Sequence, residues 1–141
     1  MTMKLTTMTM KHIILFLLAM LLPIGASAYQ DYKAYDAYVD GIYYKLSGDE
    51  AKVTYEEGYV FPCYSGSVVI PSTITFEGKT YRVSAIDQEA FYQCTDLTSV
   101  TFGDNVTSIG WRAFYGCTGL TSITIPENVT YTDQEAFSGC I

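Results

Sequence analysis

The stretch Ser84–Val106, SAIDQEAFYQCTDLTSVTFGDNV, is followed directly by Thr107–Val129, TSIGWRAFYGCTGLTSITIPENV. The two segments align without gaps at a shift of 23 residues, and the pattern continues into the last residues of the chain. This period predicts a solenoid of stacked coils, because one unit alone buries too little apolar surface to be stable. The most regular positions are an Ala-Phe pair and a later cysteine: Ala90-Phe91, Ala113-Phe114, Ala136-Phe137, Cys94, Cys117 and Cys140.

Each unit contains one predicted strand and one short helical turn. Apolar and polar residues alternate over 97–102 and 120–125, which is typical of a half-buried strand. The spacing over Gln88–Cys94 predicts a helical turn with its apolar side inward. We expect inward side chains at Val100, Phe102, Ile123 and Ile125, and an open Ser/Thr face made of Ser99, Thr101, Ser122 and Thr124. Equivalent phenylalanines should stack in an internal column.

The repeated unit resembles the BspA-type leucine-rich repeats of bacterial surface proteins. The combination A-F-x-x-C-x-x-L-x-x-[VI]-x-[IF] carries this resemblance over about half of the chain. It implies a leucine-rich-repeat solenoid that is mainly β, with a parallel sheet. It also implies export and a non-enzymatic protein-interaction or adhesion role, with a partner such as host matrix or another cell-surface protein. Asn105 and Asn128 follow the strands, and either a ladder between coils or a simple turn role suits them.

The first 28 residues have the features of a cleaved export signal. Lys4 and Lys11 precede an apolar run from Ile13 to Leu22, and Ala26-Ser27-Ala28 has the small-x-small pattern of a cleavage site. We therefore predict cleavage after Ala28 and a secreted or cell-surface protein. The apolar run is too short to span a bilayer comfortably, so we predict no transmembrane anchor after cleavage.

Two further regions complete the predicted organisation. We expect an antiparallel β-hairpin cap over 29–66, with a loosely ordered lead-in at 29–38. A second hairpin, which turns at Glu77-Gly78, is expected after this cap. We expect repeats over 67–141: a degenerate first one, two full ones and an incomplete last one. Thr132 replaces the apolar residue of the earlier repeats. The chain is either a fragment of a longer array or a minimal protein that self-associates through its open C-terminal repeat edge.

Composition excludes several classes of function. The net charge is −7 and the isoelectric point about 4.4, which argues against a nucleic-acid partner. His12, the only histidine, lies in the predicted signal, so no Ser-His or Cys-His pair is available to the mature chain. We predict no enzyme activity, no cofactor and no metal site. A carbohydrate-active accessory domain that uses carboxylates and aromatic side chains is the enzyme-related alternative.

The four cysteines allow more than one interpretation. Cys94, Cys117 and Cys140 share one repeat position, whereas Cys63 lies outside the register. In an exported protein they could form disulfides, and Cys63 could pair with another cysteine. We expect instead a column of small buried free thiols.

One position breaks the repeat and marks a candidate contact site. Where the other units have Gln-Glu, the middle unit has Trp111-Arg112, and Tyr92 and Tyr115 stand on the neighbouring turn. Trp and Arg dominate the energetics of protein interfaces, so this pair is a plausible hot spot. The alternative is ordinary surface variation with Trp111 lying flat on the solenoid. The Ser/Thr face is the second candidate surface.

Overall fold

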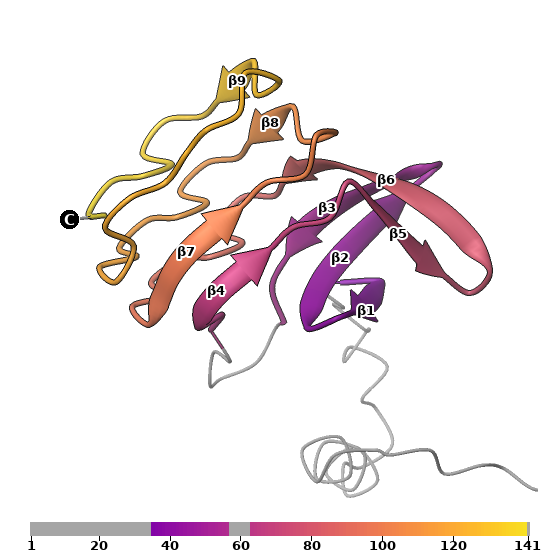
Figure 1. Cartoon of the computed structure of the whole chain (residues 1–141), viewed down its shortest axis with the longest axis horizontal. Coiled ribbons are helices and arrows are strands. Elements are labelled where there is room, and N and C mark those ends of the chain that lie inside the picture. Colours follow the sequence, from indigo (N-terminus) through magenta and orange to yellow (C-terminus); the bar gives the residue numbers. More distant parts are fainter. Residues whose placement is uncertain (1–34, 57–62, 141) are drawn as a thin grey trace, which may run out of the picture. The chain divides into compact units, whose positions relative to one another are not determined.

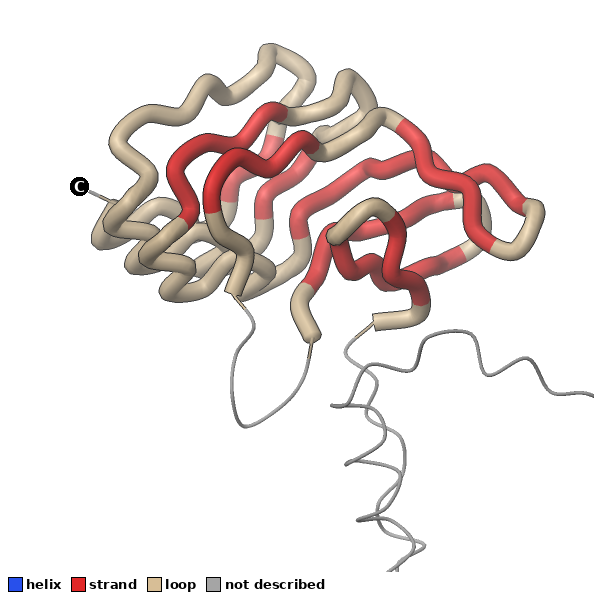
Figure 2. Tube along the Cα trace, turned by 60° about the horizontal axis from the view of Figure 1, so that its bottom comes forward, coloured by secondary structure: helices blue, strands red, loops and turns tan. Residues whose placement is uncertain are grey.

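The computed structural model describes residues 35–56 and 63–140, and these residues form strands and turns without a helix (Figures 1 and 2). The predicted signal at 1–28 and its cleavage site therefore lie outside the described residues. The strands are β1 (Ala37–Val39), β2 (Ile42–Ser47), β3 (Glu50–Thr54), β4 (Gly66–Val69), β5 (Thr73–Phe76), β6 (Lys79–Ile86), β7 (Leu97–Thr101), β8 (Ser108–Ile109) and β9 (Tyr131–Thr132).

Two sheets make up the described part of the chain. The larger has the order β1-β2-β3-β6-β8-β9, with β5 paired to β6, and the smaller consists of β4 and β7. Pairing is antiparallel within β1-β2-β3 and between β5 and β6, and it is parallel from β3 to β6 onward and between β4 and β7. The predicted fold, a solenoid with a parallel sheet preceded by antiparallel hairpins, is confirmed (Figure 1).

The antiparallel hairpins turn on glycines. Gly48 lies between β2 and β3 with φ +59°, and Glu77-Gly78 lies between β5 and β6 with φ +50° and +79°. Both turns agree with the sequence pattern. The expectation of a loose lead-in up to residue 38 was wrong where the structure describes it, because Ala37–Val39 is a strand. It pairs with β2 through an Asp40-Gly41 turn with φ +49° and +85°, which suits a two-residue hairpin.

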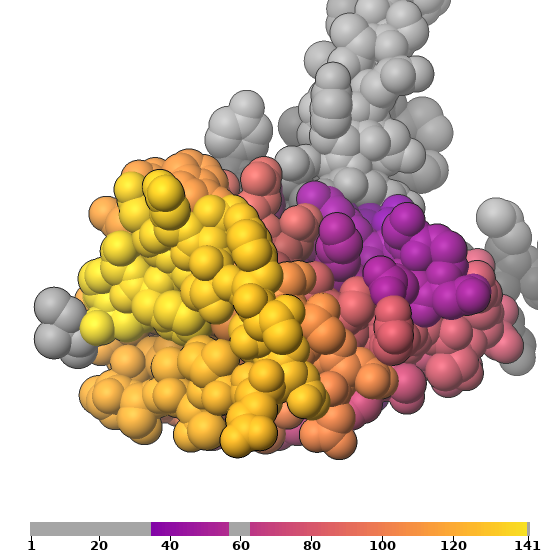
Figure 3. Space-filling model, turned by 90° about the horizontal axis from the view of Figure 1, so that it is seen from above, coloured from indigo at the N-terminus to yellow at the C-terminus, as the bar shows by residue number. Residues whose placement is uncertain are grey.

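The 23-residue period places equivalent residues side by side in the parallel sheet. Ala85 pairs with Ser108 and Ser108 with Tyr131, one coil apart each time. In the smaller sheet Val68 pairs with Val100, so β4 occupies the place of a first repeat strand, as predicted. In the space-filling view the coils follow one another from the indigo hairpins to the yellow C-terminal coil (Figure 3).

The predicted phenylalanine column lies inside the stack. The Phe91 and Phe114 rings are 4.8 Å apart between centroids and 7° from parallel, and Phe114 and Phe137 are 5.2 Å apart and 4° from parallel. Phe91 and Phe114 are fully buried, whereas Phe137 is half-buried. The column therefore provides a continuous apolar interior across three coils.

The expected helical turns are absent from the described residues, and successive turns replace them. The Tyr92 and Cys94 amides donate to the carbonyls three residues earlier, but Glu89 and Gln93 have φ of +55° and +53°, which interrupts a right-handed helix. The alternate amides donate to the next coil instead, as the Phe91 N–H does to the Ala113 carbonyl at 2.7 Å. This intercoil ladder satisfies groups that an isolated helical turn would leave open.

The predicted strand over 120–125 does not form. No bridge joins this segment to β7 in the described part of the chain, and no described strand lies on its other side. Its apolar side chains are accordingly less covered than predicted: Ile125 is exposed and Ile123 half-buried, whereas Val100 on β7 is buried. Phe102, also expected to point inward, is half-buried and meets Phe114 edge-on.

The asparagines link the coils. The Asn105 Nδ2 donates to the Ser72 carbonyl at 3.0 Å, and the Asn128 Nδ2 donates to the Asp104 carbonyl at 2.6 Å. Each acceptor belongs to the preceding coil, so the ladder interpretation holds over the simple turn role. Gly103 makes the close approach possible, because a Cβ there would lie 2.5 Å from the Ser72 nitrogen.

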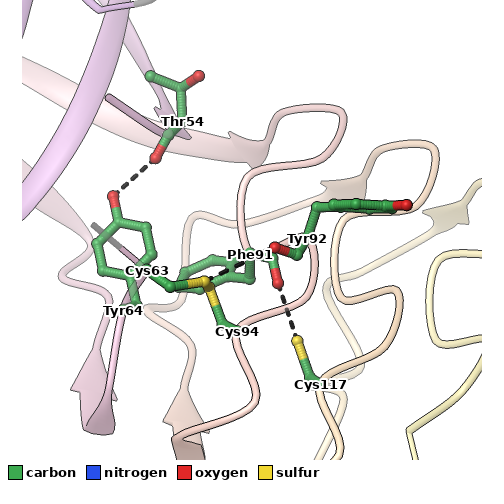
Figure 4. The surroundings of a disulfide bond; sticks show 7 residues. All are labelled: Thr54, Cys63, Tyr64, Phe91, Tyr92, Cys94 and Cys117. Carbon is green, nitrogen blue, oxygen red and sulfur yellow. Dashed lines mark hydrogen bonds between the residues drawn. A yellow bond between two sulfur atoms is a disulfide. The ribbon is translucent and has the colours of Figure 1, made fainter. Parts of the chain in front are cut away.

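The N-terminal end of the column is closed by Tyr64 and a disulfide (Figure 4). The Tyr64 ring packs on Phe91 with centroids 4.6 Å apart, and its hydroxyl donates to the Thr54 carbonyl at 2.7 Å. Beside it, Cys63 is bonded to Cys94, with their Cα atoms 5.1 Å apart. The expectation of four free thiols was therefore wrong. Cys63 precedes β4, the first repeat strand, and occupies the place next to the first thiol of the column.

Candidate interaction surface

Four predicted contact residues form one partly exposed cluster, called here the aromatic-arginine cluster: Trp111, Arg112, Tyr115 and Tyr92. The guanidinium carbon of Arg112 lies 4.4 Å from the centre of the Trp111 ring and 5.0 Å from that of Tyr115. Tyr115 in turn stacks on Tyr92, with ring centroids 5.3 Å apart and planes 13° from parallel. Trp111 is 37% exposed, so the cluster presents an aromatic face to solvent beside a cation.

The turn that carries the cluster is held by backbone hydrogen bonds. The Ala113 amide donates to the Gly110 carbonyl and the Tyr115 amide to the Arg112 carbonyl. Arg112 itself has φ +51°, the same left-handed conformation as its equivalents Glu89 and Glu135. The coil above is fixed by a bond from the Gln93 amide to the Tyr115 carbonyl at 2.7 Å. Stacking of equivalent turns therefore places Tyr92 against Tyr115.

Glu135 of the next coil completes the electrostatics of the cluster. Its Oε2 lies 2.5 Å from the Arg112 Nε, and both side chains are partly exposed. This hydrogen bond raises the pKa of the Arg112 guanidinium above its ordinary value, so the cation is present at every physiological pH. Glu135 bonds the Nε edge of the Arg112 guanidinium group. This ion pair orients the guanidinium over the Trp111 and Tyr115 rings. This contact was not predicted from the sequence. Its signal was the acidic residue that recurs at one repeat position, as Glu89 and Glu135.

The predicted Ser/Thr face is only partly assembled. Ser99 and Thr101 are exposed on β7, and the Ser99 hydroxyl donates to the Ser67 hydroxyl of β4 at 2.8 Å. Ser122 and Thr124 are exposed too, but they lie on the segment that forms no strand. Among the described residues no recorded contact joins this face to the aromatic-arginine cluster. The structure thus brings together the first four predicted site residues and leaves the other four as a separate surface.

The two free cysteines of the described residues, Cys117 and Cys140, lie in surroundings that suit a structural role. The Cys117 thiol donates to the Phe91 carbonyl and the Cys140 thiol to the Phe114 carbonyl, each at 2.9 Å. Burial raises the pKa of Cys117 to about 12, so its nucleophilic thiolate is scarce at neutral pH. Cys117 is therefore a buried free thiol, as expected, whereas Cys140 is free but only half-buried.

Two absences among the described residues concern metal binding and membrane crossing. No group of three or more His, Cys, Asp or Glu side chains is placed to hold a metal ion. Within the same described ranges, no helix has the length and apolar character needed to cross a membrane.

No curated protein matches the chain. A leucine-rich repeat protein from Bacteroides ovatus has 26% identity and a TM-score of 0.62, covering 75% of this chain and 33% of that one. A leucine rich cell surface protein from Faecalibacterium prausnitzii has 32% identity and a TM-score of 0.59, covering 78% and 30%. A leucine-rich repeat protein from Bacteroides capillosus has 30% identity and a TM-score of 0.58, covering 68% of this chain and 69% of that one.

The chain thus spans about a third of the length of the Bacteroides ovatus structure. The family model described as "BspA type Leucine rich repeat region (6 copies)" matches residues 62–141, more than half of the chain. These residues include the aligned coils, the phenylalanine column and the aromatic-arginine cluster. This chain belongs to the BspA-type leucine-rich repeat family.

Proposed function

We propose that this chain is an exported, non-enzymatic module that binds another protein through the aromatic-arginine cluster. Repeats of this family are protein-interaction modules, and a cell-surface protein is among the similar structures. The observation that carries the proposal is the exposed Trp111 with Arg112 over its ring, at a position where the other units have Gln and Glu. Such a residue pair supplies a large desolvated contact and a fixed cation.

The mechanism proposed is recognition by a rigid platform. Tyr92 and Tyr115 are stacked, and Glu135 fixes Arg112, so little side-chain entropy is lost when a partner binds. The Ser/Thr face of β4 and β7 would add polar contacts. Host-matrix proteins or proteins of another cell surface are the proposed partners.

The experiment is surface plasmon resonance of the purified protein over a panel of purified extracellular-matrix and bacterial surface proteins. For each protein captured, Trp111→Ala should weaken binding by about 2 kcal/mol or more, roughly thirtyfold. The matched control is Gln134→Ala, which changes an exposed residue at the same position of the next coil. Equal effects of the two substitutions on every captured protein would reject the cluster as the binding site.

Export is tested separately. We expect a bacterial host that expresses the whole chain to release a product that begins at Tyr29, measured by intact mass. Ala28→Arg should block processing because it removes the small residue that the peptidase requires. A released product that retains residues 1–28 would contradict the proposed cleavage.

A second candidate function is self-association through the last coil. Ile125 is 39% exposed and Tyr131 57% exposed, and Phe137 is stacked on one side only by a described ring. Sedimentation velocity over a range of concentrations tests it. A concentration-dependent dimer that Tyr131→Lys abolishes would support self-association, and a monomer at every concentration would reject it.

A further inference from the structure

A groove lies far from the aromatic-arginine cluster in the sequence, between the β1-β2 turn and β4. Its volume is about 600 Å³, within the range of sites that bind ligands. Tyr38, Asp40 and Tyr43 line one wall, and Ser67 and Val69 line the other. Figure 1 shows β4 between β7 and the β1-β2 hairpin.

One wall of the groove is an open strand edge. In a parallel ladder, alternate residues direct their backbone groups to the same neighbour. The Gly66 amide donates to the Asp96 carbonyl and the Ile70 amide to the Thr101 carbonyl, both at 2.8 Å, so these residues face β7. Ser67 and Val69 face away, and no hydrogen bond from their amides to any described residue is recorded. Such an edge is a template for another strand.

The groove has apolar side chains on its rim and a preformed inner wall. Val69 is 67% exposed and Tyr38 56% exposed, which places two of the largest exposed apolar side chains of the described chain on its rim. Its inner wall is fixed, because the Tyr64 hydroxyl donates to the Thr54 carbonyl and accepts from the Tyr43 amide at 3.0 Å. The Cys63–Cys94 disulfide anchors the residue next to Tyr64. A partner would therefore meet an ordered surface.

Charge indicates what the partner carries. Asp40 is the only charged side chain among the described lining residues, and no ion pair of Asp40 is recorded with them or with any other described residue. The whole chain has a net charge of −7, so a second copy would bring more negative charge to the groove. A segment with a Lys or Arg opposite Asp40 is complementary instead.

We propose that this groove binds an extended segment of a partner polypeptide, which adds as a strand to β4. The segment places apolar side chains against Val69 and Tyr38 and a basic side chain against Asp40. The backbone groups of Ser67 and Val69 supply the main-chain hydrogen bonds, as in strand addition to other sheet edges. This site is independent of the aromatic-arginine cluster, so either can fail without the other.

The test uses a fluorescein-labelled peptide, Ile-Lys-Val-Lys-Ile with blocked termini, titrated with the purified protein at low salt. We expect saturable binding that is lost when alternate backbone nitrogens of the peptide are methylated, and binding that is weaker when Glu replaces Lys. Val69→Lys should weaken binding about tenfold, which is the loss of one buried apolar side chain. Asp40→Asn, which keeps the left-handed turn, should weaken it about two- to fivefold. Thr98→Lys is the matched control, because Thr98 is exposed on β7 and belongs neither to the groove lining nor to the Ser/Thr face, and it should leave binding unchanged.

Amide exchange measured by NMR identifies the occupant. We expect the Ser67 and Val69 amides to exchange rapidly in the free protein and slowly with the peptide, while the Val68 amide is protected in both states. Slow exchange of Ser67 and Val69 without peptide would overturn the proposal in favour of an edge covered by the same chain. A dimer that Val69→Lys dissociates would overturn it in favour of a second copy. Binding that the methylated peptide retains would overturn strand addition.

Discussion

The two ends of the coil stack differ in how their apolar interior is closed. At the N-terminal end Tyr64 covers Phe91, and the Cys63–Cys94 disulfide and the antiparallel hairpins of β1, β2 and β3 secure the first coil. At the other end Phe137 is half-buried, both residues of β9 are exposed, and Ile125 is exposed. Closure of the N-terminal end thus depends on a covalent bond and on one additional aromatic side chain. The repeat itself provides neither.

The difference teaches that stability is graded along the stack. In repeat proteins each coil is stabilised mainly by its neighbours, so a coil with one described neighbour opens most easily. We therefore expect opening to begin at the C-terminal coil and to reach the disulfide last. Three predictions test this gradient, and two more concern a buried thiol and a buried hydroxyl.

The largest effect is expected in the centre of the phenylalanine column. Phe114 is fully buried between two rings, so Phe114→Ala should lower the free energy of unfolding by about 3–5 kcal/mol. Phe137→Ala should cost about 1–2 kcal/mol, because that side chain is half-buried and has one described ring neighbour. Urea unfolding followed by circular dichroism measures both. Equal losses would mean that the two positions are equally covered in solution.

The disulfide should contribute the next largest effect. It joins residues 31 apart in sequence, and the Cys63→Ser/Cys94→Ser double variant should lose about 3–4 kcal/mol of unfolding free energy. The control is Cys140→Ser at the open end, which removes only a half-buried thiol. Thermal and urea unfolding with and without reductant provide the measurement. A double variant as stable as the control would show that the N-terminal clamp is not needed.

The two free thiols report the gradient directly. Burial raises the pKa of Cys117 to about 12 and also raises the pKa of Cys140 above its ordinary value. With iodoacetamide at pH 8, Cys140 should react about tenfold faster or more, because its coil opens more readily. Mass spectrometry of digested protein measures the rates. Faster reaction of Cys117 would reverse the proposed order of opening.

The same shift sets a dependence of stability on pH. The folded state holds the Cys117 proton more tightly than the unfolded state, whose pKa is near 9. The stabilisation is therefore complete below pH 9 and declines as the pH rises from 9 to about 12. Cys117→Ala should make this decline shallower without abolishing it, because the pKa of Cys140 and those of several tyrosines are raised as well; thermal unfolding at a series of pH values measures the difference.

The smallest effect is expected near the closed end. The Thr54 hydroxyl is buried and has no hydrogen-bond partner recorded in the structure. Thr54→Val keeps the shape and removes the unsatisfied group, so we expect a gain of up to about 1 kcal/mol. Thr54→Ala, which leaves a void, is the control and should be destabilising. A loss with valine would indicate that the hydroxyl has a partner in solution.

The repeat register predicted most of the fold, because it is a local and recurrent signal. The local residues Glu77-Gly78 predicted a hairpin turn, and the register correctly placed the phenylalanine column. It could not show that the turn over 88–94 uses left-handed residues, since the reason is the hydrogen bonds to the next coil. The Asp40-Gly41 turn carried a readable signal that was missed. The Cys63–Cys94 bond carried none, because Cys63 has no repeat equivalent.

The candidate site was predictable for a different reason. Trp111 and Arg112 depart from the repeat, and a departure from a regular pattern is visible in one sequence. Their contact with Tyr115 follows from the turn, but the placement of Tyr92 and Glu135 requires the spacing between coils. The β4 groove was not predictable, because β1 and the open edge are joined only in three dimensions.

The position of the disulfide also determines how the chain would respond to force. Under a pulling force along the stack, the described coils after Cys94 would separate one after another, because no recorded disulfide links these coils to one another. Further extension would stop at the disulfide between Cys63 and Cys94. The segment between these cysteines, which are 31 residues apart in sequence, cannot lengthen while the bond is intact. A repeat protein built in this way would lengthen in steps under load, while its disulfide kept the first coil closed.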